Sequence, residues 1–419
     1  MDTYHISGGS RLEGSCRVNG AKNAVLPILA ASLMGEGGSR IKNCPGLSDV
    51  YAMISILEST GCVIDFKNGI IDISPKNIQN AEISEELMSS LRSSIFLMGP
   101  MLAVCGEFTA GYPGGCAIGS RPIDMHIYAL RTLGAEIEEN DGTIYCRAEK
   151  LCGGEIKFQA VSVGATENAM MAAALAEGTT IIKNAAREPE IAELERFLNC
   201  MGASVKGAGT DTIVIEGRKN LRGCEFSVMS DRIEAGTLLA AVAATGGEAL
   251  LTEAPVREMK NITEILRKTG CRIHAEGNFI YIKSPEKLKS PEYIETNPYP
   301  GFPTDMQSQI MTLMCVSEGS GTICENIFEQ RFQTAPYLVK MGADIIIDGK
   351  YAFIKGKEKL SGARLKAEDL RGGAALVIAA LCADGESDIE NVCLIDRGYD
   401  KLDTMLKNLG ANIQRIKEE

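Results

Sequence analysis

The sequence contains no tryptophan, only three histidines and few aromatic residues, which make up 5% of its 419 residues. It has no Cys-x-x-Cys motif, and no histidine and cysteine stand at zinc-ligand spacing, so we predict no structural metal. The longest nearly apolar stretches, such as 93–105, are too short to cross a bilayer. The amino terminus has no basic segment followed by an apolar run. We therefore predict a cytoplasmic protein without membrane insertion.

Positive charge is also in short supply, and the net charge is −12. Such a surface disfavours nucleic acid and anionic membranes as partners, so an anionic substrate would need a local basic cluster. No P-loop or dinucleotide-binding fingerprint occurs, which argues against ATP and NAD, and we predict no cofactor. The 14 cysteines are scattered from Cys16 to Cys393, and we expect them to be reduced and mostly buried.

Glycine is abundant, with 44 residues, and part of it marks an internal repeat. The pattern Leu-x-x-x-Gly-x-x-Val/Ile occurs six times, and the spacing from one glycine to the next is 68 to 73 residues. A glycine in this pattern predicts a helix that ends in a left-handed residue and is followed by a strand. The six glycines are Gly61, Gly134, Gly202, Gly270, Gly342 and Gly410.

A second element also occurs six times, as a helix of about three turns rich in Ala, Leu and Met. A helix that is apolar nearly all round is buried on most sides. Each unit therefore reads as strand, buried helix, strand, exposed helix, strand, strand, over about 70 residues. The six apolar segments are 23–37, 93–107, 167–180, 234–247, 306–321 and 372–386.

Six units predict an α/β protein with two domains of three repeats, since 419 residues exceed one ordinary core. In each domain three buried helices pack together with sheets outside them. We expect the first domain to span 22–229. The second would comprise 1–21 plus 230–419, because the first strand would complete it.

Basic residues stand at the starts of the apolar helices. Lys22, Arg92 and Arg371 hold such places, where helix amides and the macrodipole favour an anion. Arginine can bind phosphate or carboxylate through two parallel hydrogen bonds. Arg121, Arg331 and Arg397 lie in loops of corresponding units and are further candidates. The alternative for each is solvated surface charge.

Two other residues carry candidate chemistry. Cys116 lies in a loop with three glycines and one proline, which suits a segment that closes over a ligand. A guanidinium nearby in sequence would make its thiol reactive, although an ordinary loop thiol is the alternative. Asp305 opens the apolar helix of the fifth unit, where an N-terminal acid would explain it equally well.

Eight short motifs, in order along the whole chain, resemble the enolpyruvyl transferase family, whose members have two inside-out α/β domains around a cleft. The Pro-Gly-Gly-Cys loop is similar to the branch that uses a UDP-sugar. The motifs are Gly20-Ala21-Lys22-Asn23-Ala24, Pro113 to Gly119, Arg121-Pro122, Val161 to Thr166, Asp231 to Glu234, Pro303-Thr304-Asp305, Asp369-Leu370-Arg371 and Ile395 to Tyr399.

The resemblance implies transfer of the enolpyruvyl group of phosphoenolpyruvate to the 3-hydroxyl of UDP-N-acetylglucosamine, an early step of peptidoglycan synthesis inhibited by fosfomycin. It implies that Cys116 is the general acid and the site of a covalent adduct, and that Asp305 is the base. Lys22 and Arg397 would also be catalytic, because they stabilise negative charge, and Lys22, Asn23, Arg121, Arg371 and Arg397 would bind phosphoenolpyruvate. The UDP-sugar would contact Asn23, Arg92, Arg121, Pro122, Ile123, Asp124, Met125, Ser162, Val163, Gly164, Asp305 and Ile327.

Two positions depart from the family pattern. Ala160 stands where we expect a lysine that contacts the diphosphate, and Leu394 stands where some relatives have histidine. An inactive UDP-sugar-binding paralogue and an enzyme that uses shikimate 3-phosphate therefore remain alternatives. The chain is expected to be a monomer or weak oligomer.

Overall fold

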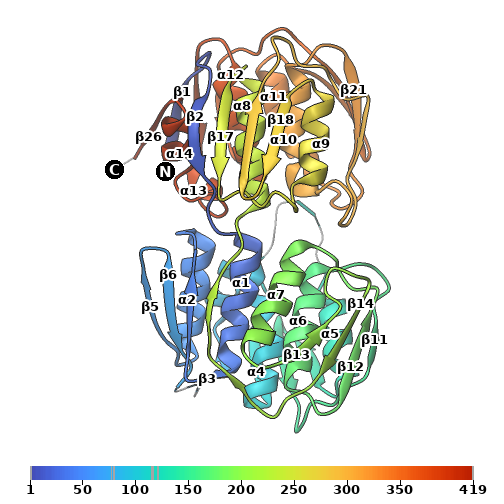
Figure 1. The fold of residues 1–419 in the computed structure, drawn as a ribbon. Coiled ribbons are helices and arrows are strands. Elements are labelled where there is room, and N and C mark those ends of the chain that lie inside the picture. Colours follow the sequence, from blue (N-terminus) through green and yellow to red (C-terminus); the bar gives the residue numbers. More distant parts are fainter. Residues whose placement is uncertain (1, 77, 79–80, 115–117, 120–121, 418–419) are drawn as a thin grey trace. The chain divides into compact units, whose positions relative to one another are not determined.

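The computed structural model describes residues 2–76, 78, 81–114, 118–119 and 122–417 (Figure 1). The chain divides into two compact units. Unit 1 comprises Met1–Asn19, Ala117–Ser120 and Ser230–Glu419, and unit 2 comprises Gly20–Cys116 and Arg121–Met229.

This division differs from the expected one at two places. It begins unit 2 at Gly20, and it groups residues 117–120 with unit 1. The first difference has a local cause, because the N–H of Ala21 donates to the carbonyl oxygen of Met229, also in unit 2, at 2.8 Å.

The third repeat shows the pattern of one unit most simply. It consists of β11 (Glu155–Lys157), α6 (Val163–Ala174), β12 (Thr179–Lys183), α7 (Pro189–Cys200), β13 (Ser204–Lys206) and β14 (Thr212–Glu216). The sheet order is β11-β12-β14-β13; β11 runs parallel to β12, and the other pairs are antiparallel. This is the order of elements that the sequence predicts.

The rest of unit 2 repeats this layout. Its elements are α1 (Lys22–Ala31), η1 (Ser32–Met34), β3 (Gly35–Glu36), β4 (Ser39–Lys42), α2 (Ser48–Ser59), β5 (Val63–Lys67), β6 (Ile70–Ser74), β7 (Glu82–Ile83), α3 (Glu85–Ser90), η2 (Arg92–Leu97), α4 (Met98–Cys105), β8 (Glu107–Gly111), α5 (Asp124–Thr132), β9 (Glu136–Asn140), β10 (Thr143–Arg147), β15 (Leu221–Arg222) and β16 (Glu225–Ser227).

Unit 1 has the same plan. Its elements are β1 (Thr3–Ser7), β2 (Glu13–Arg17), α8 (Arg232–Ala244), β17 (Glu248–Thr252), α9 (Lys260–Lys268), β18 (Arg272–Glu276), β19 (Phe279–Lys283), β20 (Tyr293–Glu295), η3 (Thr304–Met306), α10 (Gln307–Cys315), β21 (Ser320–Cys324), η4 (Arg331–Thr334), α11 (Ala335–Lys340), β22 (Asp344–Asp348), β23 (Tyr351–Lys355), β24 (Arg364–Lys366), α12 (Leu370–Cys382), β25 (Glu386–Glu390), α13 (Val392–Ile395), α14 (Leu402–Asn408) and β26 (Asn412–Ile416).

Four strands, β1, β2, β15 and β16, pair with strands far from them in sequence. β1 lies between β25 and β26, and β2 runs parallel to β17, so the amino terminus gives unit 1 two strands rather than the single one expected. In return, β16 precedes α8 in the chain but pairs with β4 of unit 2. Each unit therefore completes a sheet with a strand that stands next to the other unit in sequence.

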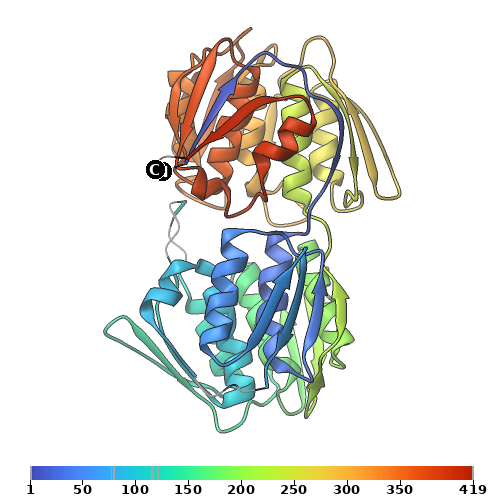
Figure 2. The ribbon, with the colours of Figure 1, turned by 90° about the vertical axis from the view of Figure 1, so that its left-hand side faces the viewer.

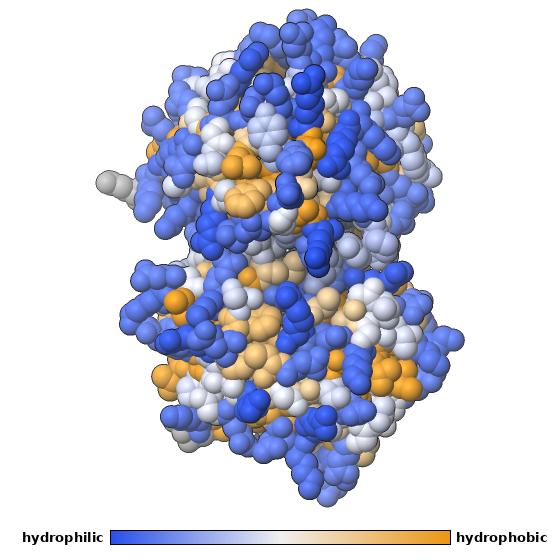
Figure 3. Space-filling view, in the orientation of Figure 1, coloured by the Kyte–Doolittle hydropathy of each residue, from blue (hydrophilic) through white to orange (hydrophobic). Residues whose placement is uncertain are grey.

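Buried helices form the centre of each unit, as the sequence predicts. In unit 1, α8, α10 and α12 contact one another pairwise, and the strands lie outside them (Figures 1 and 2). In unit 2, α4 contacts α6, and both contact η2. The face of the molecule in Figure 3 is mostly hydrophilic, with apolar side chains in small groups. The six repeat glycines all have positive φ, between 93° and 105°, which confirms the predicted helix ends.

Candidate functional site

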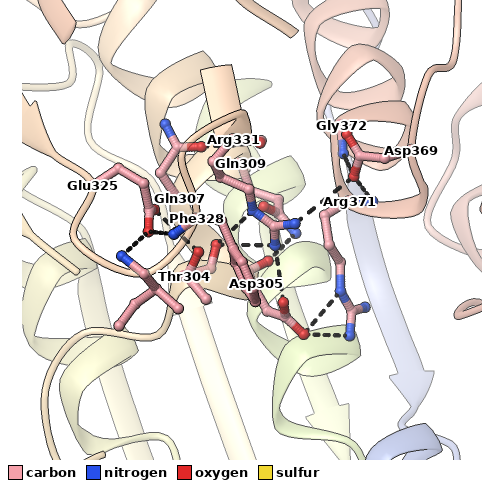
Figure 4. A network of polar contacts seen from close by, with 12 residues as sticks. Thr304, Asp305, Gln307, Gln309, Glu325, Phe328, Arg331, Asp369, Arg371 and Gly372 are labelled. Atoms are coloured by element: carbon pink, nitrogen blue, oxygen red, sulfur yellow. Dashed lines mark hydrogen bonds and ion pairs between the residues drawn. The ribbon is translucent and has the colours of Figure 1, made fainter. Parts of the chain in front are cut away.

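Asp305 lies between two arginine side chains in unit 1 (Figure 4). Its Oδ1 accepts a hydrogen bond from Arg331 Nη2 at 2.9 Å. Its Oδ2 accepts from Arg371 Nη2 at 2.9 Å and from Arg371 Nε at 3.2 Å. Asp305 stands in η3, just before the buried helix α10, Arg331 begins η4, and Arg371 is in the first turn of α12. Three separate elements thus converge on one carboxylate.

Both guanidinium groups are almost fully buried, with side chains 3% exposed, whereas the Asp305 side chain is 26% exposed. Arg331 is held further by two hydrogen bonds to the carbonyl oxygen of Thr304. Burial opposes ionisation of Asp305, but the charges of Arg371 and Arg331 outweigh it and hold its pKa well below the usual range. The carboxylate is therefore a weak proton acceptor while both arginines contact it.

One donor atom of Arg371 has no acceptor among the described residues. Nη1 of Arg371 is buried and has no hydrogen-bond partner among the described residues. A buried guanidinium N–H without an acceptor is costly, so the group can gain free energy from an added anion oxygen.

Two further aspartates begin the neighbouring helices. The carboxylate of Asp369 accepts from the N–H groups of Arg371 and Gly372 at the start of α12. The carboxylate of Asp231 accepts in the same way from Ile233 and Glu234 in α8. Both side chains act as helix caps, which fixes the first turns that carry the buried arginines.

The Arg371 guanidinium packs against the ring of Tyr399, whose hydroxyl belongs to a buried hydrogen-bond network. The Cζ of Arg371 lies 5.4 Å from the centre of the Tyr399 ring, and the Tyr399 hydroxyl lies 2.9 Å from Thr237 Oγ1. Gln309 Nε2 donates to that hydroxyl at 3.3 Å and to the Asp305 carbonyl oxygen at 3.0 Å. Burial raises the pKa of Tyr399, so the phenol stays neutral.

The turn that carries Arg397 is tied to the last strand of the chain. Arg415 in β26 donates to both oxygens of Asp396, at 3.0 and 2.7 Å, and to Asp2 at 2.6 Å. Arg397 directly follows Asp396 and is half-buried. The two hydrogen bonds from the Arg415 guanidinium to Asp396 therefore fix the backbone next to Arg397.

In unit 2, Lys22 is the first residue of α1, and its side chain is 11% exposed. Its Nζ lies 2.8 Å from Asp49 Oδ2 in α2. Asn23 is the next residue of the same turn, and Arg92 begins η2. These positions match the predicted helix starts.

The predicted diphosphate segment forms the start of α6. Ser162 is the N-cap, and its hydroxyl accepts from the N–H of Ala165 at 3.3 Å. A Cβ at Gly164 would meet the His126 ring at 3.2 Å, so glycine permits the close packing of α6 against α5. Asp124 and Met125 open α5 after Ile123 and Pro122.

Comparison with known proteins gives the family. The family model described as EPSP synthase (3-phosphoshikimate 1-carboxyvinyltransferase) matches residues 6–415. UDP-N-acetylglucosamine 1-carboxyvinyltransferase 2 of Caldanaerobacter subterraneus subsp. tengcongensis is 48% identical over 99% of this chain and 100% of its own length. UDP-N-acetylglucosamine 1-carboxyvinyltransferase of Myxococcus xanthus is 45% identical over the full length of both. The chain belongs to the UDP-N-acetylglucosamine 1-carboxyvinyltransferase family.

Solved structures agree on the fold of this family. The enolpyruvyl transferase NikO from Streptomyces tendae has a TM-score of 0.90 at 23% identity, covering 100% of this chain and 99% of NikO. EPSP synthase from Acinetobacter baumannii has a TM-score of 0.80 at 20% identity, with both chains fully covered. These neighbours confirm the predicted fold class.

Two predicted residues, Cys116 and Arg121, lie outside the described residues. Near them, the N–H of Gln330 donates to the carbonyl oxygen of Ile118 at 3.1 Å, within unit 1. Ile327, predicted to contact the sugar, lies in a turn held by Glu325, whose Oε1 accepts from the Ile327 N–H at 2.8 Å. Glu325 also accepts from Thr304 Oγ1 at 3.0 Å, which links this turn to Asp305.

Sequence reasoning assigned no role to Tyr399, Gln309, Thr237 or Glu325. Tyr399 stands in a recognised motif, so a signal existed for it, whereas the other three are ordinary polar residues of an apolar helix or a loop. Among the described residues, no group of three or more His, Cys, Asp and Glu side chains could hold a metal ion. Within the same residues, no helix is long and apolar enough to span a membrane.

Proposed function

We propose that this chain transfers the enolpyruvyl group of phosphoenolpyruvate to the 3-hydroxyl of UDP-N-acetylglucosamine and releases phosphate. The observation that carries the proposal is full-length identity of 44–48% to relatives whose names state this activity. This reaction would be the first committed step of peptidoglycan synthesis. We place the enzyme in the cytoplasm, as a monomer or weak oligomer.

The proposal gives the basic residues the task of binding anions. Phosphoenolpyruvate carries a phosphate and a carboxylate, so it needs several cations. Lys22, Arg121, Arg371 and Arg397 are assigned to it, with Asn23 as a neutral donor. The open Nη1 of Arg371 supports this assignment, since an anion oxygen would satisfy it.

Arg331 joins this group. Its guanidinium shares the Asp305 carboxylate with Arg371, so an anion that reaches one arginine lies close to the other. The negative charge that develops during addition and elimination would be stabilised by these fixed cations.

The UDP-sugar is assigned to residues at the starts of α1, η2, α5 and α6 in unit 2, and to η3 and the turn at Ile327 in unit 1. Exposed amides at a helix start suit a diphosphate. The assigned residues are Asn23, Arg92, Arg121, Pro122, Ile123, Asp124, Met125, Ser162, Val163, Gly164, Asp305 and Ile327.

Asp305 is assigned as the base for the sugar 3-hydroxyl and Cys116 as the acid toward the methylene carbon. Because two arginines depress the pKa of Asp305, the carboxylate can accept a proton only after a substrate anion draws a guanidinium away from it. Substrate binding would thus prepare the base. Addition of the oxygen at C2 gives a phosphate ketal, and loss of a proton and phosphate gives the vinyl ether.

The test is release of inorganic phosphate from phosphoenolpyruvate with UDP-N-acetylglucosamine, with shikimate 3-phosphate or without acceptor. Release only with the UDP-sugar is expected. Release only with shikimate 3-phosphate would overturn the substrate assignment. Binding of the UDP-sugar without any release would identify an inactive paralogue and direct attention to Ala160 and Leu394. Cys116→Ser should abolish turnover and alkylation by fosfomycin; normal turnover in this variant would remove Cys116 from the mechanism.

A further inference from the structure

The last turn of α7 packs against strands β15 and β16 in unit 2. The N–H of Arg222 donates to the carbonyl oxygen of Met201 at 2.9 Å, and the Phe197 and Phe226 rings lie 5.3 Å apart. Residues three and four apart share one side of a helix, so Cys200 faces the same strands as Phe197. These contacts fix the register of the helix end against the strands.

Cys224 stands between β15 and β16, two residues before Phe226, and successive side chains of an extended segment alternate between faces. It therefore points to the α7 side. The Sγ of Cys200 lies 3.7 Å from the carbonyl oxygen of Glu225, the residue next to Cys224. The Cys200 side chain therefore reaches the backbone next to Cys224. Both residues are partly exposed, so a small reagent can reach them.

We propose that Cys200 and Cys224 form an oxidisable dithiol site, at which a peroxide converts the two thiols to an intrachain disulfide. The contacts of Phe197 and Arg222 hold the end of α7 against the segment that carries Cys224, so the two cysteines lie on neighbouring segments before any reaction. The bond would tether the end of α7 to the segment that continues to Met229, the last residue of unit 2.

The chemistry balances with the peroxide as oxidant. The thiolate of Cys200 attacks one peroxide oxygen, the O–O bond breaks, and Cys200 becomes a sulfenic acid while water leaves. The Cys224 sulfur then attacks the sulfenic sulfur, the S–O bond breaks, and a second water leaves with the remaining protons. Two electrons pass from the thiols to the peroxide.

The two thiols have different tasks. Burial is the largest cause that raises the pKa of the Cys224 thiol. A thiol that holds its proton so firmly reacts slowly with peroxide, so the first oxidation falls to Cys200. Cys224 serves as the resolving thiol because it lies on the segment next to Cys200.

The experiment treats the full chain, folded and reduced, with hydrogen peroxide, blocks remaining thiols and digests with trypsin. Cleavage after arginine and lysine places the two cysteines in separate peptides, 197–206 and 223–232, each with one cysteine. The expected product is these two peptides joined, with the mass of two hydrogen atoms lost. The variants Cys200→Ser and Cys224→Ser should give no such product.

Two controls distinguish a built site from random oxidation. The exposed Cys152 and Cys393 report general reactivity, and treatment of the unfolded chain reports pairing without the fold. The proposal is overturned if the joined peptides are absent while Cys200 is oxidised singly. It is equally overturned if Cys200 pairs with other cysteines as often as with Cys224, or if joining requires unfolding. A non-reducing gel should show the oxidised protein as a single chain.

Discussion

Replacing Asp305 with alanine removes the carboxylate that hydrogen-bonds to both Arg331 and Arg371, and leaves Asp369 at 4.0 Å from Arg331. Both guanidinium groups are 3% exposed, so the variant leaves two buried positive charges close together. Removing one partner of a buried pair costs ~3–5 kcal/mol. Because the Asp305 side chain is 26% exposed, we expect the lower end of that range.

A loss of about 3 kcal/mol lowers the unfolding temperature of a unit of about 200 residues by roughly 6–12 °C. An added anion should reverse much of this loss. Phosphate at a hundred times its dissociation constant returns ~2.7 kcal/mol to a protein that binds it only when folded. In the wild type, Asp305 already occupies Nη2 of both arginines and Nε of Arg371, so phosphate competes with it for these donors and its effect there should be smaller.

The assay is calorimetric unfolding of wild type and Asp305→Ala, in chloride and in phosphate of equal ionic strength. Asp384→Ala is the matched control, since it removes an exposed aspartate paired with Lys359 in the same unit. An exposed pair contributes little, so this control should unfold close to wild type in both salts.

Two results would refute the reasoning. If Asp305→Ala has the same unfolding temperature as Asp384→Ala, the Asp305 carboxylate does not stabilise the two buried arginines. If phosphate raises the unfolding temperatures of wild type and Asp305→Ala equally, Asp305 does not occupy an anion site between the arginines.

Two further predictions concern buried charge and positioning. Burial and the charge of Asp231 raise the pKa of Glu234 to about 8, so its contribution to stability is complete below the normal carboxyl pKa and is lost as pH rises toward 8, by ~1.4 kcal/mol per pH unit. Glu234→Gln should therefore gain unfolding temperature relative to wild type from pH 5 to 8, and a difference independent of pH would contradict this. Arg415→Lys keeps the positive charge but loses the pair of hydrogen bonds that the guanidinium donates to Asp396. If these hydrogen bonds position Arg397, KM for phosphoenolpyruvate should rise about tenfold. KM for the UDP-sugar should stay unchanged and serves as the control.

The repeat could be predicted because its signals are local. A glycine after the last helical turn, such as Gly202 with φ of 98°, is required by the backbone of its own turn. An all-apolar helix such as α12 reveals its burial in its own composition. Six copies of each signal, at nearly constant spacing, then fix the number of units.

The strand exchange could be predicted only in part, because it depends on partners distant in sequence. The sequence places β16 directly before α8, yet its hydrogen bonds go to β4, more than 180 residues away. No local pattern in Glu225–Ser227 distinguishes this pairing from a strand of the following repeat. The burial of the Glu167 carboxyl in α6, which has no hydrogen-bond partner among the described residues, could not be predicted either, since the helix pattern around it is apolar.

In the candidate site too, the features with a local signal could be predicted and the contacts between distant residues could not. Residue types at helix starts identified Lys22, Asp305 and Arg371, because helix ends are visible in the sequence. The contact between Asp305 and Arg371 joins residues 66 positions apart, and the capping role of Asp369 follows from its own backbone. The contact needed the tertiary structure, whereas the cap is a local feature of the helix start.

In the proposed mechanism, the pairing of Asp305 with two arginines links anion binding to proton transfer. A carboxylate held by two guanidinium groups binds a proton weakly, and this is its state without substrate. A substrate anion competes for the same donors, and every hydrogen bond that it takes from Asp305 raises the pKa of that carboxyl. The proposed base would therefore become effective only where phosphoenolpyruvate is bound, which ties activation of the acceptor hydroxyl to the presence of the donor. The phosphate effect on Asp305→Ala measures the first half of this coupling, because it reports the competition directly.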